Sequence, residues 1–205
     1  MKKKLSTYIY VTFFVLASFP CSTSYTRVIY KGPPPVNPGY GVPVIELSED
    51  LHPGIDYVIP PGTPIIAVSD GRVIKISNPL LDRGDLKAGE GLFVLISHEP
   101  YFWSVYGHLI ESVVEPGREI KRGELIGFSG PQRDSADTRL HFGVVKVGGW
   151  SERYSQTYDP NNFWLGKKPQ CFDPQKDYSS HSAKEITLPV ACGEYQKKLL
   201  KLSDH

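Results

Sequence analysis

The stretch that decides the fold is HPGIDYVIPPGTPIIAVSDGRVIKIS, residues 52–77. Within it, PIIAVS and RVIKIS are short runs rich in Val and Ile, and Asp70 and Gly71 lie between them. Such runs are typical of strands, and an Asp-Gly pair tolerates the positive φ that tight hairpin turns need. The stretch therefore predicts a β-hairpin formed by residues 64–69 and 72–77.

Further runs of the same kind follow along the chain, namely GLFVLIS, FWSVYG, ELIGFS and LHFGVVKV, with a polar loop at residues 78–90. Helical periodicity is nearly absent until EYQKKLLKL, residues 194–202, which is compatible with a short amphipathic helix. We therefore expect an all-β fold, an antiparallel sandwich or partly open barrel, with a short C-terminal helical or irregular tail.

Length and charge limit the classes of protein that the chain can belong to. With 205 residues it is long enough for one ordinary domain and short for two. Lys and Arg number 23 against 22 Asp and Glu, so the basic surplus that nucleic acid demands is missing. We expect a single domain that does not bind nucleic acid.

The N-terminus has the layout of a secretory signal peptide. Three lysines, at residues 2–4, precede an apolar run from Tyr8 to Phe19 that is too short to span a bilayer. Cys21 stands where a lipoprotein would be acylated, but the preceding Ser18, Phe19 and Pro20 lack the small residue expected next to an acylated cysteine. In contrast, Ser22 and Ser24 are spaced like an ordinary cleavage site. We expect residues 1–24 to be removed, giving an exported protein, periplasmic or extracellular, with no transmembrane segment in the mature chain.

Cleavage after residue 24 leaves one pair of cysteines, Cys171 and Cys192. Disulfides persist in exported proteins, so we predict that the two are bonded, which would stabilise the fold by about 3 kcal/mol in the chain-entropy model. Two unpaired buried thiols are the alternative.

Candidate metal ligands come from two distant segments. His52 and Asp56 lie in HPGID, where Gly54 permits a close approach of the backbone, and His141 lies in TRLHFGVV. Imidazole and carboxylate groups are good zinc ligands, although single histidines are more often ordinary surface or strand-end residues. Three other histidines, His98, His181 and His205, have no partner at an informative spacing and are expected at the surface.

Four ordered motifs resemble the M23, or lysostaphin-like, family of zinc metallopeptidases. HPGIDYVIPPGTPIIAVSDGRVI is similar to the family's opening motif, SVYGHL to its central motif, EPGREIKRGELIGFSG to its glycine-punctuated hairpin and LHF to its last metal-binding strand. The resemblance implies a fold of the duplicated hybrid motif type and zinc held by His52, Asp56 and His141, with His108 as a catalytic residue. It also implies a peptidase domain at residues 45–165, between a Pro/Gly-rich extended lead-in, 25–44, and a C-terminal extension, 166–205.

Two positions depart from the family pattern. Arg139 stands where the first histidine of the HxH motif is expected, and Gly143 replaces the glutamate that commonly follows HF. Arginine offers only donors and cannot act as a general base, although it can stabilise an oxyanion. One assisting histidine, His108, remains.

The resemblance implies an exported zinc metalloendopeptidase that hydrolyses peptide bonds of peptidoglycan through a zinc-activated water. The alternative is a weakened or inactive module that binds cell wall or regulates a partner hydrolase, and Arg139 motivates it. A third possibility is cleavage of another protein, such as a glycine-rich one.

Overall fold

The computed structural model describes residues 28–42, 51–77, 92–130, 138–147 and 157–202. The predicted leader, Cys21, the polar loop at 78–90 and His205 lie outside these residues.

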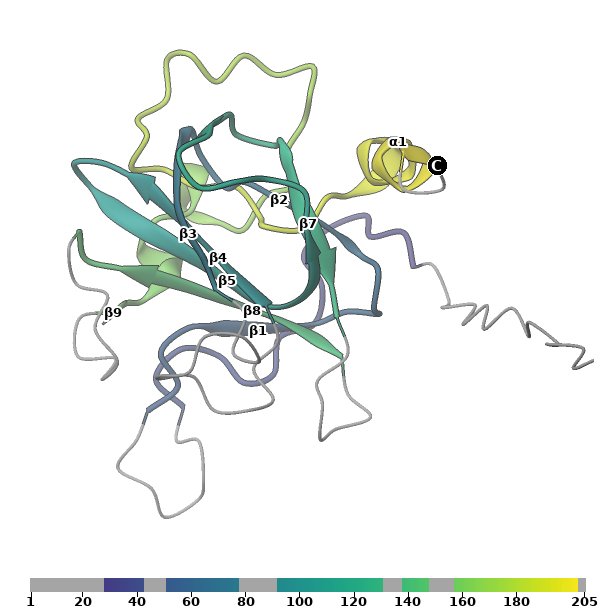
Figure 1. Ribbon diagram of the computed structural model, residues 1–205, viewed down its shortest axis with the longest axis horizontal. Helices are drawn as coiled ribbons and strands as arrows, with labels where there is room; N and C mark the ends of the chain where they lie inside the picture. The colour runs from purple at the N-terminus through teal and green to yellow at the C-terminus, as the bar shows by residue number, and fades with distance from the viewer. Residues whose placement is uncertain (1–27, 43–50, 78–91, 131–137, 148–156, 203–205) are drawn as a thin grey trace, which may run out of the picture.

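In the described residues, short strands dominate and one α-helix follows them near the C-terminus (Figure 1). The elements are β1 (Ile55–Val58), β2 (Pro64–Ile66), β3 (Gly71–Ser77), β4 (Leu92–His98), β5 (Phe102–Ser112), β6 (Glu119–Ile120), β7 (Leu125–Ser129), β8 (Arg139–Val145), β9 (Thr157–Tyr158), two 3₁₀ turns (Pro160–Asn162 and Leu165–Lys167) and α1 (Gly193–Leu202). None of the described helices is long and apolar enough to cross a membrane.

All the strand pairs are antiparallel, and the main sheet has the order β1-β8-β5-β4-β3-β6. The end of the long strand β5 also pairs with β7, and the register of this pair shifts between Leu109 and Glu111. β7 in turn pairs with β2. The β2–β7 pair thereby lies over the main sheet (Figure 1). This architecture confirms the predicted all-β class with a short C-terminal helix.

The predicted hairpin around Asp70 and Gly71 is wrong. β2 pairs with β7, whereas β3 pairs with β4 and β6, so the two strands do not pair with each other. The Asp70 carboxylate accepts hydrogen bonds from the backbone N–H of Arg122, at 2.9 Å, and from Lys121 Nζ, at 2.9 Å. These contacts hold the Asp-Gly pair in a crossover from one layer to the other, in which Gly71 does not adopt a positive φ.

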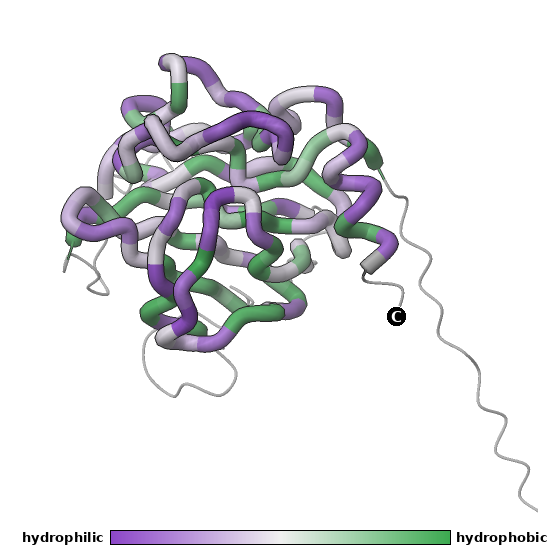
Figure 2. The backbone as a smooth tube through the Cα atoms, turned by 90° about the horizontal axis from the view of Figure 1, so that it is seen from above, coloured by the Kyte–Doolittle hydropathy of each residue, from purple (hydrophilic) through white to green (hydrophobic). Residues whose placement is uncertain are grey.

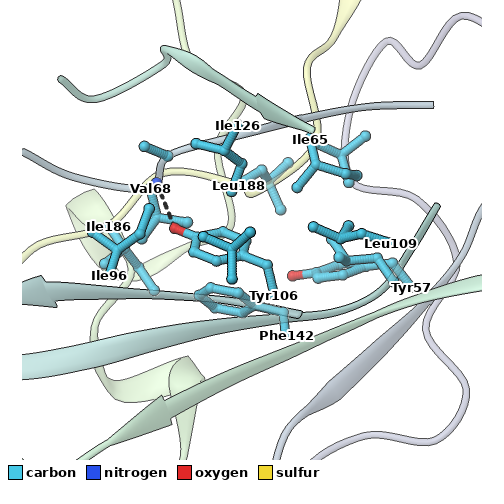
Figure 3. Close-up of a cluster of buried hydrophobic side chains, with 14 of the residues drawn as sticks. Tyr57, Ile65, Val68, Ile96, Tyr106, Leu109, Ile126, Phe142, Ile186 and Leu188 are labelled. Carbon is cyan, nitrogen blue, oxygen red and sulfur yellow. Dashed lines mark hydrogen bonds between the residues drawn. The ribbon is translucent and has the colours of Figure 1, made fainter. Parts of the chain in front are cut away.

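The core fills the space between the two layers. Ile65, Ile126 and Leu188 face Tyr106 and Phe142 of the main sheet across it (Figure 3). The Tyr106 hydroxyl accepts a hydrogen bond from the backbone N–H of Val68 at 3.0 Å, which ties the crossover to the sheet. Figure 2 shows hydrophobic and hydrophilic residues interleaved along the chain, as half-buried strands require.

His98, expected at the surface, is buried inside this fold with 1% of its area exposed. Its Nδ1 donates to the carbonyl oxygen of Asp70 at 2.7 Å, and its Nε2 lies 2.7 Å from Ser104 Oγ. Burial and the nearby Arg122 charge outweigh this hydrogen bond and lower the pKa of His98 to about 4. His98 is therefore a neutral, structural side chain at physiological pH.

The segment that follows β9 is cross-linked within itself and also contacts the segment that precedes β1. Cys171 and Cys192 form a disulfide with their Cα atoms 5.8 Å apart. In α1 the buried Gln196 accepts from the backbone N–H of Tyr30 and donates to the carbonyl oxygen of Val28, both at 2.8 Å. The C-terminal helix thus holds the beginning of the Pro/Gly-rich segment, residues 28–42, which we call the strap.

Candidate metal centre

Strand pairing brings the predicted ligands together. Asp56 in β1 lies directly opposite His141 in β8, and His141 lies opposite Gly107 in β5 on its other side. His52 lies just before β1 in the sequence. The antiparallel register therefore joins two segments that are 85 residues apart in the sequence.

The donor atoms of the three residues converge on one point. Asp56 Oδ1 lies 2.8 Å from His141 Nδ1 and 3.1 Å from His52 Nε2. One ligand atom from each residue lies within 4.8 Å of the others, and His52 and Asp56 are buried. In the described part of the chain, these three side chains form a group of metal-ligating residues that could hold a metal ion.

The donor set and its spacing fit zinc. Zinc–nitrogen and zinc–oxygen bonds of roughly 2.0–2.2 Å in a tetrahedron separate neighbouring donors by about 3.3–3.5 Å. The two contacts made by Asp56 Oδ1, 2.8 Å and 3.1 Å, are of hydrogen-bond length, so these side chains would move apart by a few tenths of an ångström to hold the ion, or about half an ångström in the case of His141. Two imidazoles and a carboxylate form a donor set of catalytic zinc sites, whereas structural zinc sites use four protein ligands.

Gly54 permits this convergence, as the sequence predicts. A Cβ atom at Gly54 would lie 2.5 Å from the carbonyl oxygen of Phe142 and 2.8 Å from His141 Cε1. Both separations are shorter than the non-bonded contacts that a Cβ atom makes, so only glycine lets the chain that carries His52 pass this close to β8.

His52 is oriented by the strap. Its Nδ1 lies 3.1 Å from the carbonyl oxygen of Gly39, and because a carbonyl only accepts, Nδ1 carries the proton. In the neutral ring the lone pair is then on Nε2, whereas in the protonated ring Nε2–H donates to Asp56 Oδ1, 3.1 Å away. Burial lowers the pKa of His52, but the hydrogen bond and the charge of Asp56 outweigh burial, and the net shift is upward.

Asp56 is held in its ionised form. Burial raises the pKa of this carboxyl group, but the hydrogen bonds from His141 and His52 and their charges outweigh burial and hold it well below its usual range. A carboxylate that stays ionised is the protonation state that metal binding requires.

His108 lies next to this cluster. Its ring centroid is 6.3 Å from that of His141, in an edge-to-face arrangement. The backbone of His108 has φ of 60°, which is uncommon for a residue other than glycine, and its carbonyl accepts from the Gly130 N–H at 2.8 Å. Strained backbone of this kind is concentrated at functional sites.

Arg139 lies beside the cluster as well, at the start of β8. Its Nη1 is 3.3 Å from Asp56 Oδ2 and 3.3 Å from the carbonyl oxygen of Asn37 in the strap. The guanidinium thus contacts the carboxylate oxygen that the two histidines do not. At Gly143 a Cβ atom would lie 3.7 Å from His141 Nε2, an ordinary van der Waals contact, so a Cβ atom would fit beside the cluster at this position.

Sequence reasoning did not find the strap residues Gly39 and Asn37. They contribute backbone carbonyl groups, which carry no side-chain signature, and the proline and glycine content of the segment indicated only an extended strap or linker. The fold and these contacts together define an antiparallel β domain with a candidate divalent-metal centre of the two-histidine, one-carboxylate type.

Comparison with known proteins gives the family. Residues 50–157, just over half of the chain, match the sequence model of peptidase family M23, and the chain belongs to that family. It is 30% identical to the glycyl-glycine endopeptidase ALE-1 of Staphylococcus capitis over 70% of this chain and 35% of that protein. It is 35% identical to the murein hydrolase activator NlpD of Escherichia coli over 49% of this chain and 24% of that protein.

Among solved structures, the catalytic domain of the antimicrobial peptidase lysostaphin from Staphylococcus simulans is similar. Its TM-score is 0.52 at 26% identity, over 62% of this chain and 90% of that domain. The chain spans between about a fifth and two fifths of the length of the first curated relatives that it matches. The similarity therefore concerns one domain of those proteins.

Proposed function

We propose that the chain is an exported zinc metalloendopeptidase that cuts peptide bonds in peptidoglycan. In this proposal His52, Asp56 and His141 hold the zinc, and His108 is the catalytic histidine. The supporting observation is the convergence of three donor atoms within 4.8 Å from the paired strands β1 and β8. A regulatory module without a metal has no need for this arrangement.

The residues around the candidate centre would have different roles in hydrolysis. When bound, zinc would polarise the carbonyl group under attack and lower the pKa of a water molecule to about 7. His108 can accept or donate a proton beside His141. Arg139 can only donate, and its contact with Asp56 commits at least part of that capacity to the ligand.

The substrate class rests on relatives. The names of two of them refer to a glycyl-glycine endopeptidase and to a murein hydrolase activator. We propose peptidoglycan stem or cross-link peptides as the substrate for this chain. We also propose export, on the signal peptide expected at residues 1–24 and on the disulfide, since an oxidising compartment preserves it.

The test uses the leaderless protein and purified cell-wall sacculi. We expect release of soluble peptide fragments, loss of that release with a chelator, and recovery when zinc is added back. His181→Ala is a matched control, because His181 is a half-buried histidine in residues 166–205 whose contacts are with Tyr178 and, in a loose 3.8 Å ion pair, with Glu185. Absence of metal-dependent release would refute the proposed activity.

Arg139 supports a second candidate, a catalytically weakened module that binds cell wall or regulates a partner hydrolase. The replacement Arg139→His distinguishes the two. A large gain of hydrolysis from an otherwise silent protein would favour the weakened module, whereas wild-type activity that Arg139→His does not increase would exclude it. Glycine-rich peptides in the same assay would test cleavage of a non-wall protein.

A further inference from the structure

The strap lies outside the residues that match the family. In the fold it runs beside the segment that carries His52 and Asp56. Its backbone pairs with β1 on the edge opposite β8. The contacts run from the N–H of Val58 to the carbonyl of Pro35 (2.8 Å), from the N–H of Asn37 to the carbonyl of Asp56 (2.9 Å) and from the N–H of Asp56 to the carbonyl of Pro38 (3.0 Å). The strand that carries Asp56 is thereby fixed from both sides.

The strap holds His52 even more completely. The N–H of His52 donates to the carbonyl of Val42, and its carbonyl accepts from the N–H of Gly41, both at 2.9 Å. The imidazole is held as well, through the contact between Nδ1 and the Gly39 carbonyl. Every backbone hydrogen-bonding group of His52 and one ring nitrogen therefore contact the strap.

A further contact reaches the carboxylate. Arg139 Nη1 lies between the carbonyl of Asn37 and Asp56 Oδ2, at 3.3 Å from each. Since the histidines contact Oδ1, Arg139 and the strap fix which oxygen of Asp56 faces the centre. The residue that replaces a histidine of the family pattern thus links the strap to a candidate ligand.

We propose that the strap, together with the C-terminal helix that anchors it, positions the metal ligands. Both elements lie outside residues 50–157, which match the family. Gly39 and Gly41 act on His52, and Arg139 carries the effect to Asp56. Gln196 holds the far end of the strap at Val28 and Tyr30. This inference rests on the proposed zinc site, and it extends that site beyond the residues matched by the family.

Gly41 is the position at which the inference is best tested. It has φ of +72°, and a Cβ atom there would meet no other atom within 4 Å. Replacing it with alanine adds backbone strain where the strap pairs with His52 and changes neither charge nor packing. Gly117, in the turn before β6, has φ of +90° and equally open space, so Gly117→Ala adds similar strain away from the centre.

The measurement is zinc affinity of the metal-free, leaderless full chain by competition with a chromophoric chelator, together with hydrogen exchange at the His52 amide. Loss of contacts that orient metal ligands typically weakens binding by about 10–100-fold, and we expect about tenfold for Gly41→Ala, with faster exchange at His52. Gly117→Ala should keep wild-type affinity. Gln196→Ala should weaken zinc binding in the same direction, whereas Lys197→Ala, on the exposed face of α1, should not.

The outcomes separate the two proposals. If the wild-type protein binds no zinc, the proposed function fails and the inference fails with it. If the wild-type protein binds zinc and Gly41→Ala and Gln196→Ala bind it equally well, only the inference is overturned. Equal weakening by Gly41→Ala and Gly117→Ala would also overturn it, because general destabilisation would then explain the effect.

Discussion

We expect the substitution Gly54→Ala to lower both the stability of the protein and its affinity for zinc. The added Cβ atom would lie 2.5 Å from the carbonyl oxygen of Phe142 and 2.8 Å from His141 Cε1. The carbonyl belongs to the backbone of β8, which pairs with β1 on one side and β5 on the other, so it cannot move without disturbing both neighbours. The segment of chain around Gly54 or the His141 ring must therefore shift.

The size of the effect follows from this crowding. Overpacking of a well-packed site typically destabilises a protein by about 1–3 kcal/mol. For a chain of this size each kcal/mol lowers the melting temperature by about 2–4 °C, so we expect a fall of about 2–12 °C. Because the His141 ring is one of the two crowded groups, zinc affinity should fall as well.

Thermal unfolding with and without zinc measures both effects. Gly32→Ala serves as the control, since a Cβ atom there would meet no atom within 4 Å and the backbone has no positive φ, and its stability should change by less than about 0.5 kcal/mol. A Gly54→Ala protein that melts like the wild type and gains as much stability from zinc would refute the view that this close approach places His141.

Other predictions concern catalysis, pH and the disulfide. If the wild-type protein releases fragments from sacculi, His108→Ala should reduce the rate by about 10²–10⁴-fold with zinc stoichiometry unchanged, and loss of zinc in this variant would contradict the role given to His108. Since the pKa of His98 falls from 6.5 to about 4 on folding, the unfolded chain binds a proton that the folded chain does not as pH drops through this window. The free energy of unfolding should decrease by about 3 kcal/mol from pH 7 to pH 4, and denaturant titrations of His98→Gln should lack that part of the slope. Reduction of Cys171–Cys192 should lower the free energy of unfolding by about 3 kcal/mol, and urea midpoints that do not change with reductant would contradict this.

The fold class and the candidate ligands were predictable, because both depend on residue types that occur in a characteristic order along the sequence. Runs of Val, Ile and Phe between glycines and prolines indicated the antiparallel class, which the structure confirms. The motif around His52 and Asp56 and the motif around His141 indicated one site, and the structure brings the three side chains together. Their role as zinc ligands stays a prediction that zinc stoichiometry tests.

The parts that sequence reasoning missed depend on distant contacts. Asp70 and Gly71 have hairpin composition, but the hydrogen bonds from Lys121 and Arg122 determine their conformation, and these residues are more than 50 positions away. The burial of His98 likewise depends on the carbonyl oxygen of Asp70 in the crossover, 28 residues away. Local patterns contain no information about such partners.

The pairing of the strap with β1 has a consequence for the solubility of shortened forms of the chain. A fragment that begins at residue 50, where the family match starts, would leave the outer edge of β1 without its partner, and exposed strand edges recruit other chains. In the intact protein the strap covers that edge, and its prolines at 33–35 and 38 offer no N–H to a further strand. We expect the fragment to self-associate and the longer chain to remain monodisperse, so the segment that the family match omits also protects the domain from aggregation.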